Sequence, residues 1–200
     1  MRIIVTAGPT REYIDDVRFI SNASSGRMGW AVCREALRRG HEVSLFAGPV
    51  CLEPPPGARF EAFTCADDLG ELLPAAVKEA DCLVMAAAVG DYRPAERIKG
   101  KHRKRPTLTL DLVATTDVLA SLAPCKGSRV FVGFALEAEN AVENARRKLE
   151  AKSLDMVVVN SPESFGAGEA DFAFVLPGGE VKDLGRISKE RLAGLLLDEA

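Results

Sequence analysis

Several features are missing from this sequence, and each absence excludes a class of protein. The 200 residues contain no apolar run near the ~20 residues of a membrane-spanning helix, so we expect no membrane segment. A strand-like pattern begins at residue 2 and leaves no room for a signal peptide, which predicts a cytoplasmic protein. The five cysteines form no Cys-x-x-Cys pair, which favours reduced thiols over disulfides or a zinc site.

Charge and composition exclude further classes. The net charge of −3 gives the chain as a whole no attraction for nucleic acid. A content of 47% hydrophobic and 28% charged residues predicts an ordinary globular protein with its own core. We find no linker, repeat or low-complexity segment, so residues 1–200 are expected to form one domain.

The common catalytic and nucleotide-binding motifs are also missing. Neither Gly-x-Gly-x-x-Gly nor Gly-x-x-x-x-Gly-Lys-Ser/Thr occurs. The only histidines are His41 and His102, and no Ser–His–Asp set is visible. An enzyme with this sequence would therefore act by positioning and charge stabilisation rather than through a covalent nucleophile.

Strand-like and helix-like patterns alternate along the chain. This order predicts an α/β fold: a Rossmann-like, doubly wound, mostly parallel sheet with helices on both faces and a small antiparallel C-terminal hairpin. The expected strands are 2–6, 42–47, 60–64, 82–88, 129–135 and 155–159, and the expected helices are 27–39, 67–80, 139–152 and one from about 188.

Two segments depart from this regular alternation. Residues 107–112 alternate in polarity and predict a half-exposed strand, and 171–185 predict the hairpin. Pro74 should kink the helix at 67–80 or delay its start. Ligands in such sheets bind beyond the carboxyl ends of the strands, so we expect four loops to converge there: 7–29, 87–105, 134–140 and 160–170.

The first of these loops predicts an anion site. A short strand, a small-residue loop and the polar run 21–29 precede a helix, whose N-terminal N–H groups and dipole favour negative charge. Arg11 and Arg27 add positive charge, and Asn22 adds a carboxamide. We expect a phosphorylated ligand at this loop.

Two other segments allow more than one interpretation. Asp91 follows small residues at a strand end, where it could bond a ribose, hold a metal or simply lie on the surface. The run 97–105 holds six Lys or Arg and fits a mobile loop, a lid over a triphosphate, or less well an RNA contact. Lys148 and Lys152 share a helix face near its C-terminus, for which the helix dipole is a sufficient reason.

Five stretches together resemble the phosphopantothenate–cysteine ligase family, the ligase half of bifunctional bacterial coenzyme A biosynthesis proteins. They are 6–12, 17–29, 86–92, 132–135 and 152–160, and they span nearly the whole chain in order. The resemblance implies a ligase that activates the carboxylate of 4′-phosphopantothenate with CTP, or with ATP, and then adds cysteine. It also implies Mg²⁺ and a homodimer.

The resemblance assigns roles to individual residues. Asn22 is implied to hold the acyl-nucleotide intermediate, and Arg97 and Lys99 correspond to a basic catalytic pair. Arg11, Asn22 and Arg27 are expected to bind substrate. The expected nucleotide-binding residues are Gly8, Ser24, Ser25, Gly26, Ala87, Asp91, Thr116, Asp117, Val118, Leu119, Phe134, Lys148 and Lys152. The metal ligands are unknown, since Mg²⁺ is implied to be held mainly by nucleotide phosphates.

The chain departs from the family pattern in a few places. Arg97 stands where the family usually has lysine, which keeps the charge but replaces a point charge with a planar fork. Thr116 replaces a usual proline, and Gly90 a usual alanine. The decarboxylase half of fused members is missing from these 200 residues, so we expect a separate phosphopantothenoylcysteine decarboxylase as partner or its removal from the chain.

Two other functions remain open. An NAD(P)-binding reductase would suit the fold but would need an acidic residue after the strand 42–47, where Gly48 and Pro49 follow instead. A catalytically idle nucleotide-binding module would be favoured by loss of Asn22 or of the basic run, and both are present.

Overall fold

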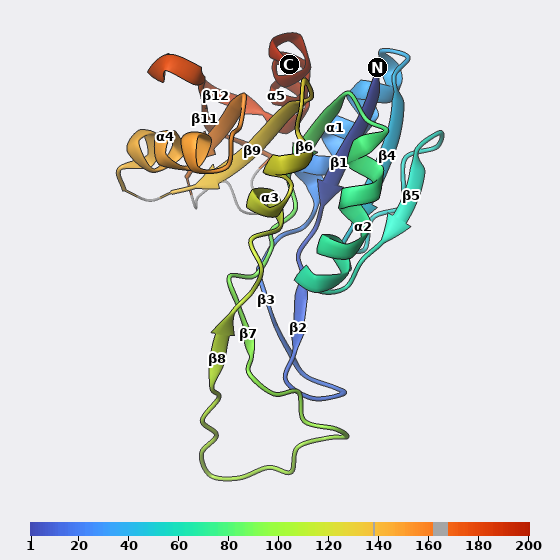
Figure 1. Ribbon diagram of the computed structural model, residues 1–200, viewed down its shortest axis with the longest axis vertical. Helices are drawn as coiled ribbons and strands as arrows, with labels where there is room; N and C mark the ends of the chain where they lie inside the picture. Colours follow the sequence, from blue (N-terminus) through green and yellow to red (C-terminus); the bar gives the residue numbers. More distant parts are fainter. Residues whose placement is uncertain (138, 162–167) are drawn as a thin grey trace.

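A computed structural model describes residues 1–137, 139–161 and 168–200 (Figure 1). Its strands and helices, in chain order, are β1 Arg2–Ala7, β2 Arg11–Tyr13, β3 Phe19–Ser21, α1 Arg27–Arg38, β4 Glu42–Ala47, β5 Arg59–Ala62, α2 Ala66–Lys78, β6 Cys82–Met85, β7 Tyr92–Pro94, β8 Leu112–Ala114, α3 Val118–Ser121, η1 Ala123–Cys125, β9 Val130–Leu136, α4 Ala141–Ala151, β10 Met156–Asn160, β11 Glu169–Val175, η3 Pro177–Gly179, β12 Val181–Ser188 and α5 Lys189–Glu199.

Eight strands form one sheet in the order β12-β11-β10-β9-β6-β1-β4-β5. The pairs from β5 to β10 are parallel, and β11 and β12 are antiparallel. From β1 the chain adds strands first on one side and then, from β6, on the other. The predicted doubly wound sheet, the C-terminal hairpin and the last helix are therefore confirmed.

The sheet is buried on both faces, because successive side chains of a strand point to opposite sides. Ile3 and Val5 of β1 pack with Trp30 of α1 and with α5 on one face. Ile4 packs with Leu73 of α2, and with α3 and α4, on the other. Within the described part of the chain, no helix is long and apolar enough to cross a membrane.

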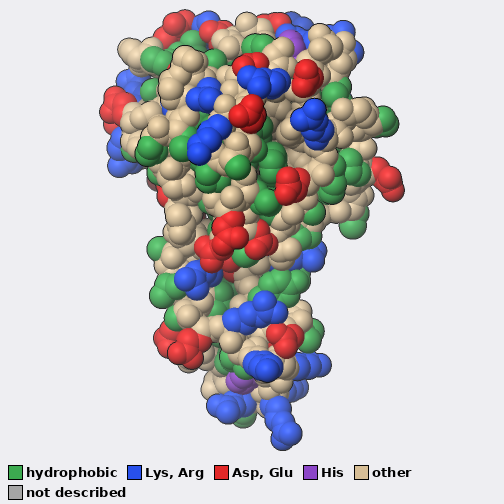
Figure 2. Space-filling view, turned by 45° about the vertical axis from the view of Figure 1, so that its right-hand side comes forward, with side chains coloured by type: hydrophobic (Ala, Val, Ile, Leu, Met, Phe, Trp, Pro, Cys, Tyr) green, Lys and Arg blue, Asp and Glu red, His purple; other side chains and the backbone are tan. Residues whose placement is uncertain are grey.

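Two small hairpins leave the sheet and form a projection, which we call the arm (residues 11–21 and 91–115). β2 pairs with β3, β7 pairs with β8, and the hairpins meet between β2 and β7. Figure 1 shows the arm extending away from the sheet. The space-filling view in Figure 2 shows Lys and Arg side chains gathered at its end.

The second helix starts earlier than expected and runs through Pro74. Its start is fixed by carboxylates: Asp68 Oδ2 accepts from the backbone N of Thr64 at 2.8 Å and of Cys65 at 3.0 Å. Glu12 Oε1 accepts from the first helical N–H at 2.9 Å. These bonds satisfy N–H groups at the helix start, so the proline does not delay the helix.

Two strand predictions were wrong in their bounds. Residues 107–111 lie outside any strand, since only Leu112–Ala114 lies opposite β7. Polarity alternation indicates two unlike faces, but a strand also needs a neighbour to bond. The strand expected at 82–88 ends at Met85, and residues 86–88 leave the sheet toward the site described next.

Candidate functional site

A cavity of about 950 Å³ lies at the carboxyl ends of β6 and β9, beside the switch point between β1 and β6. All four loops expected there contribute, together with residues 114–119, which were not among them. The fourth contributes Asn160, while 162–167 lie outside the described residues. The lining comprises residues 21–28, 85–92, 114–119 and 134–137 with Lys148, Lys152, Asn160, Phe172 and Lys189.

The N-terminus of α1 forms one wall. Gly26 adopts a left-handed conformation (φ 74°), and no side chain caps the helix. At Gly29 the helix lies so close to β1 that a Cβ would come within 2.3 Å of the Ala7 Cβ. The sequence therefore sets the start of α1 tightly on the strand, with Gly26, Arg27 and the helix N–H groups at the cavity.

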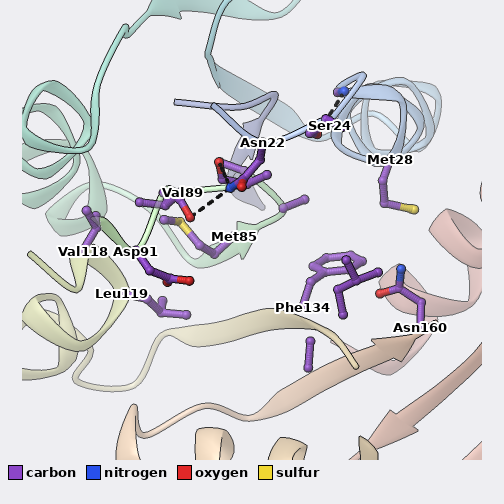
Figure 3. Close-up of a pocket in the computed structure, with 18 of the residues that line it drawn as sticks. Asn22, Ser24, Met28, Met85, Val89, Asp91, Val118, Leu119, Phe134 and Asn160 are labelled. Atoms are coloured by element: carbon purple, nitrogen blue, oxygen red, sulfur yellow. Dashed lines mark hydrogen bonds between the residues drawn. The ribbon is translucent and has the colours of Figure 1, made fainter. Parts of the chain in front are cut away.

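Asn22 connects this wall to the loop after β6. Its Nδ2 donates to the carbonyl oxygens of Ala88 at 3.1 Å and Val89 at 3.2 Å (Figure 3). A carboxamide nitrogen carries two hydrogens, and both are directed at this loop. The side chain thus offers its oxygen to a ligand, unless a ligand displaces one of the carbonyls.

Threonines that our sequence reasoning missed hold the same loop in place. The buried Thr6 and Thr10 accept through Oγ1 from the backbone N of Ala87 at 3.1 Å and of Gly90 at 2.9 Å. Thr115 Oγ1 donates to the Gly90 carbonyl at 2.5 Å. Only their place at the ends of neighbouring segments could have signalled this role, because threonine is common in strands.

One end of the cavity carries paired charges. Lys148 Nζ donates to the Phe134 carbonyl at 2.5 Å, and Lys152 Nζ lies 2.8 Å from Asp117 Oδ2. Burial and the charge of Lys152 lower the pKa of Lys148. Burial acts to raise the pKa of Asp117, but hydrogen bonds from Lys152 and from the α3 backbone lower it overall. Figure 3 shows Asp91 beside Val118 and Leu119, across the cavity from Asn160.

The opposite end is cationic. Arg27 and Lys189 both line it, with Met28, Asn160 and Phe172. Burial, followed by the charge of Arg27, lowers the pKa of Lys189. Sequence reasoning missed Lys189 because it opens a helix almost 160 residues after the anion loop, with no local motif around it.

Most of the predicted site residues meet in this cavity, but four do not line it. Gly8 lies against Gly48 and Val50, and Arg11 stacks over the Phe19 ring at 4.5 Å in the arm. Arg97 and Lys99 also lie on the arm. The predicted residues that line the cavity are Asn22, Ser24, Ser25, Gly26, Arg27, Ala87, Asp91, Thr116, Asp117, Val118, Leu119, Phe134, Lys148 and Lys152.

A second, smaller cavity of about 470 Å³ lies at the base of the arm, lined by Arg11, Arg93 and Arg97 among others. No group of three His, Cys, Asp or Glu side chains that could hold a metal occurs in residues 1–137, 139–161 and 168–200. A metal at the main cavity would instead need ligands from a bound molecule, beside the carboxylates of Asp91, Asp117 and Glu137 that line the cavity.

The fold and the cavity define a doubly wound α/β protein with a polar ligand site at the switch point of its sheet. The chain belongs to the family described as DNA/pantothenate metabolism flavoprotein C-terminal domain, whose model matches residues 1–200. The resemblance inferred from the sequence is thereby confirmed at the level of the family.

Two relatives and one structural neighbour are similar to this chain. The coenzyme A biosynthesis bifunctional protein CoaBC of Escherichia coli K12 is 39% identical over 209 residues, covering 100% of this chain and 51% of that protein. The crystal structure of a CoaBC C-terminal domain has a TM-score of 0.85 at 34% identity, covering 99% of this chain and 92% of that one. A Cab2 H337A variant in complex with phosphopantothenate-cysteine shares the fold (TM-score 0.77, 18% identity, 98% and 85% covered). The chain spans about half the length of the curated relatives that it matches.

Proposed function

We propose that this chain is a CTP-dependent ligase that joins 4′-phosphopantothenate and cysteine in coenzyme A biosynthesis. The observation that carries the proposal is the meeting of Asn22, Asp91, Phe134 and the lysine pair in one cavity. These residues come from segments far apart in the sequence, and each matches a position of the ligase family. The bifunctional relatives are named for coenzyme A biosynthesis, which supports the same function.

The proposed reaction has two steps. A carboxylate oxygen of phosphopantothenate attacks the α-phosphorus of the nucleotide, the bond to the β-phosphate breaks, and pyrophosphate leaves. The amine of cysteine then attacks the acyl carbon, loses a proton, and the nucleoside monophosphate leaves. Both steps build negative charge on oxygen, so fixed donors and cations accelerate them.

Each group in the cavity has a proposed part in this chemistry. Asn22 fixes the loop at 88–89 and lies beside the acyl group, while Lys148 and Lys152 contact the nucleotide. Asp91 is exposed at the cavity, and its carboxylate suits Mg²⁺ that keeps most of its ligands from phosphates and water. Arg27 and the start of α1 favour the phosphate of the second substrate.

We propose CTP rather than ATP, with ATP as the alternative to be measured. The base would lie against backbone groups near Ala87 and Phe134, where the Lys148 ammonium already occupies one carbonyl. An NAD(P) site in this fold needs an acidic side chain directly after the second strand to bind the ribose. Since β4 ends at Ala47 and no acidic side chain directly follows it, an NAD(P)-binding reductase is disfavoured.

We further propose that the chain works as a homodimer in the cytoplasm, with the arm in contact with the second copy. Large apolar side chains on the arm are exposed, including Val17 at 56% and Tyr92 at 58%. Arg97 and Lys99 are outside the lining of their own chain's cavity, so an arm from the partner would supply them. The product would pass to a separate decarboxylase.

The test is pyrophosphate release with phosphopantothenate, cysteine and either CTP or ATP, omitting each component in turn. Release that requires both the nucleotide and phosphopantothenate is expected. No release with either nucleotide, or equal turnover of nicotinamide substrates, would reject the function. Light scattering at micromolar protein tests the dimer, and mixing Asn22→Asp with Arg97→Ala tests whether activity returns in mixed dimers.

A further inference from the structure

The arm contains a carboxylate with no exposed surface. Asp15 lies in the turn between β2 and β3, and its exposed fraction is 0%. Its Oδ1 accepts from the backbone N of Val17 at 2.9 Å and of Arg18 at 2.7 Å. Its Oδ2 accepts from Arg18 Nε at 2.9 Å, from Arg18 Nη2 and from the His102 backbone N at 3.0 Å. A buried charge this fully bonded is expensive to replace.

Asp15 is ionised at neutral pH. The Arg18 guanidinium holds the pKa of Asp15 well below its usual range, and the backbone donors add to this, although burial acts in the other direction. The same guanidinium also donates to the His102 carbonyl at 2.7 Å. Both backbone groups of His102 are therefore hydrogen bonded: its N–H donates to Asp15, and its C=O accepts from Arg18.

Further hydrogen bonds hold the basic segment 97–102 against the same turn. Ile98 N donates to the Ile14 carbonyl at 2.9 Å, and Asp15 and Ile98 form a parallel bridge. Gly100 N donates to Asp16 Oδ2 at 2.7 Å, and the Gly100 carbonyl accepts from Asp16 N at 3.1 Å. The segment thus lies along the β2–β3 turn from end to end.

Arg97 is held at one end of this contact. Its Nη2 lies 3.0 Å from Asp16 Oδ1, and its guanidinium stacks 4.9 Å from the centre of the Tyr13 ring. These contacts alone are weak, because Arg97 and Asp16 side chains are 57% and 49% exposed. The buried carboxylate is the stronger attachment.

We propose that Asp15 is a positioning residue that fixes the basic segment 97–102 on the arm and so sets where Arg97 and Lys99 can meet a nucleotide. The inference has two halves: the docking of the segment, and its effect on catalysis. Only the second, the catalytic half, rests on the proposed ligase function. Residues 97–102 are docked against the β2–β3 turn, and the segment beyond them carries the exposed Arg103, Lys104 and Arg105.

Hydrogen exchange of the full-length protein tests the docking without any substrate. Asp15→Asn keeps the size of the side chain but replaces an acceptor with a donor that faces other donors. Amide exchange in 97–102 should become at least about tenfold faster, while the peptide of β9 keeps its rate. His102→Pro removes one N–H donor and leaves the turn intact, and Asp171→Asn on β11 is the matched surface control.

The catalytic half is tested by pyrophosphate release. Asp15→Asn should lower kcat about tenfold or more with little change in the KM for cysteine, because the cations are mispositioned while the cavity is intact. Unchanged exchange in 97–102 in both variants would overturn the inference, and so would faster exchange with unchanged kcat. Failure of the wild-type protein to release pyrophosphate would instead reject the proposed function, and with it the catalytic half alone.

Discussion

The sheet and the arm of this protein are stabilised in different ways. The sheet buries apolar side chains on both faces, including Phe131 and Leu83 at 0–1% exposure. The arm is too thin to bury a core, and large apolar residues such as Leu108 and Leu112 remain 48% and 45% exposed. Its order comes instead from hydrogen bonds and from ion pairs, among them the one between the buried Asp15 and the partly exposed Arg18.

Buried polar side chains follow the same division. Among the described residues, the buried polar or charged ones are Thr6, Thr10, Glu12 and Asp15. They lie at the end of β1 and along the start of the arm, and each bonds a backbone group of another segment. Apolar burial thus gives this protein its stability, whereas polar burial places the loops that carry the site.

Removing apolar volume from the sheet should have the largest effect. Phe131→Ala would leave a cavity in the core and should lower the free energy of unfolding by about 3–5 kcal/mol in urea titration. Leu108→Ala in the arm is the matched control and should cost less than about 0.5 kcal/mol. Similar losses for both variants would contradict the contrast between sheet and arm.

Asn22 stands where the two regions meet. Asn22→Asp should reduce pyrophosphate release about 10²–10³-fold, since a carboxylate would face both the acyl phosphate and the carbonyls of the 88–89 loop. Calorimetry should still detect CTP binding. Binding lost together with turnover would mean that Asn22 mainly shapes the cavity wall rather than serving the reaction.

The charged end of the cavity should contribute less. Lys152→Ala should raise the KM for the nucleotide about tenfold, because about one charge-assisted hydrogen bond to the nucleotide is lost. The KM for phosphopantothenate should be nearly unchanged. Lys126→Ala breaks a matching 2.8 Å pair with Asp155 outside the cavity and is the control. An equal change in the two variants would remove the link between Lys152 and the nucleotide.

A surface ion pair of the sheet layer should have the smallest effect. Arg38 and Arg39 hydrogen bond to Glu35 and lower its pKa from 4.5 to about 2. Because the folded-state pKa is depressed, the stabilisation is present above about pH 4.5 and is lost as the pH falls toward 2. Glu35→Gln should therefore cost about 0.2–1 kcal/mol per pair at pH 7 and only a small part of this near pH 2, where the folded-state carboxyl is about half protonated. A cost that does not change between these two pH values would show that the effect is not electrostatic.

The sequence predicted the sheet well because its signals are local. Apolar runs such as 82–88 and the amphipathic helix at 139–152 are stretches whose burial one can infer from period alone. The arm was not predicted, since each hairpin has only three-residue strands and the two hairpins come together from segments about 80 residues apart. Residues 107–112 show the limit: their alternation is real, but no strand lies opposite most of them.

The site divides in the same way. The composition of the 21–29 loop was enough to predict it, with Asn22, as part of the site. The resemblance adds the predicted site residues on α4 and β9. Thr115 and Lys189 were not predicted as site residues, and only the fold brings them to the cavity. Thr10, likewise not predicted, accepts from the N of Gly90 in the loop that lines the cavity. Asp15 was passed over because an aspartate in a turn is usually an exposed residue, and nothing in the sequence shows that the basic segment covers it.

The arm and the cavity share the same backbone at their junction. Residues 21–22, 90–92 and 114–116 line the cavity and are also the stretches that join the arm to the sheet. A small rotation at such a joint displaces each point of the arm in proportion to its distance from the joint. A ligand that draws the cavity wall inward therefore moves the basic end of the arm farther than any residue that it touches.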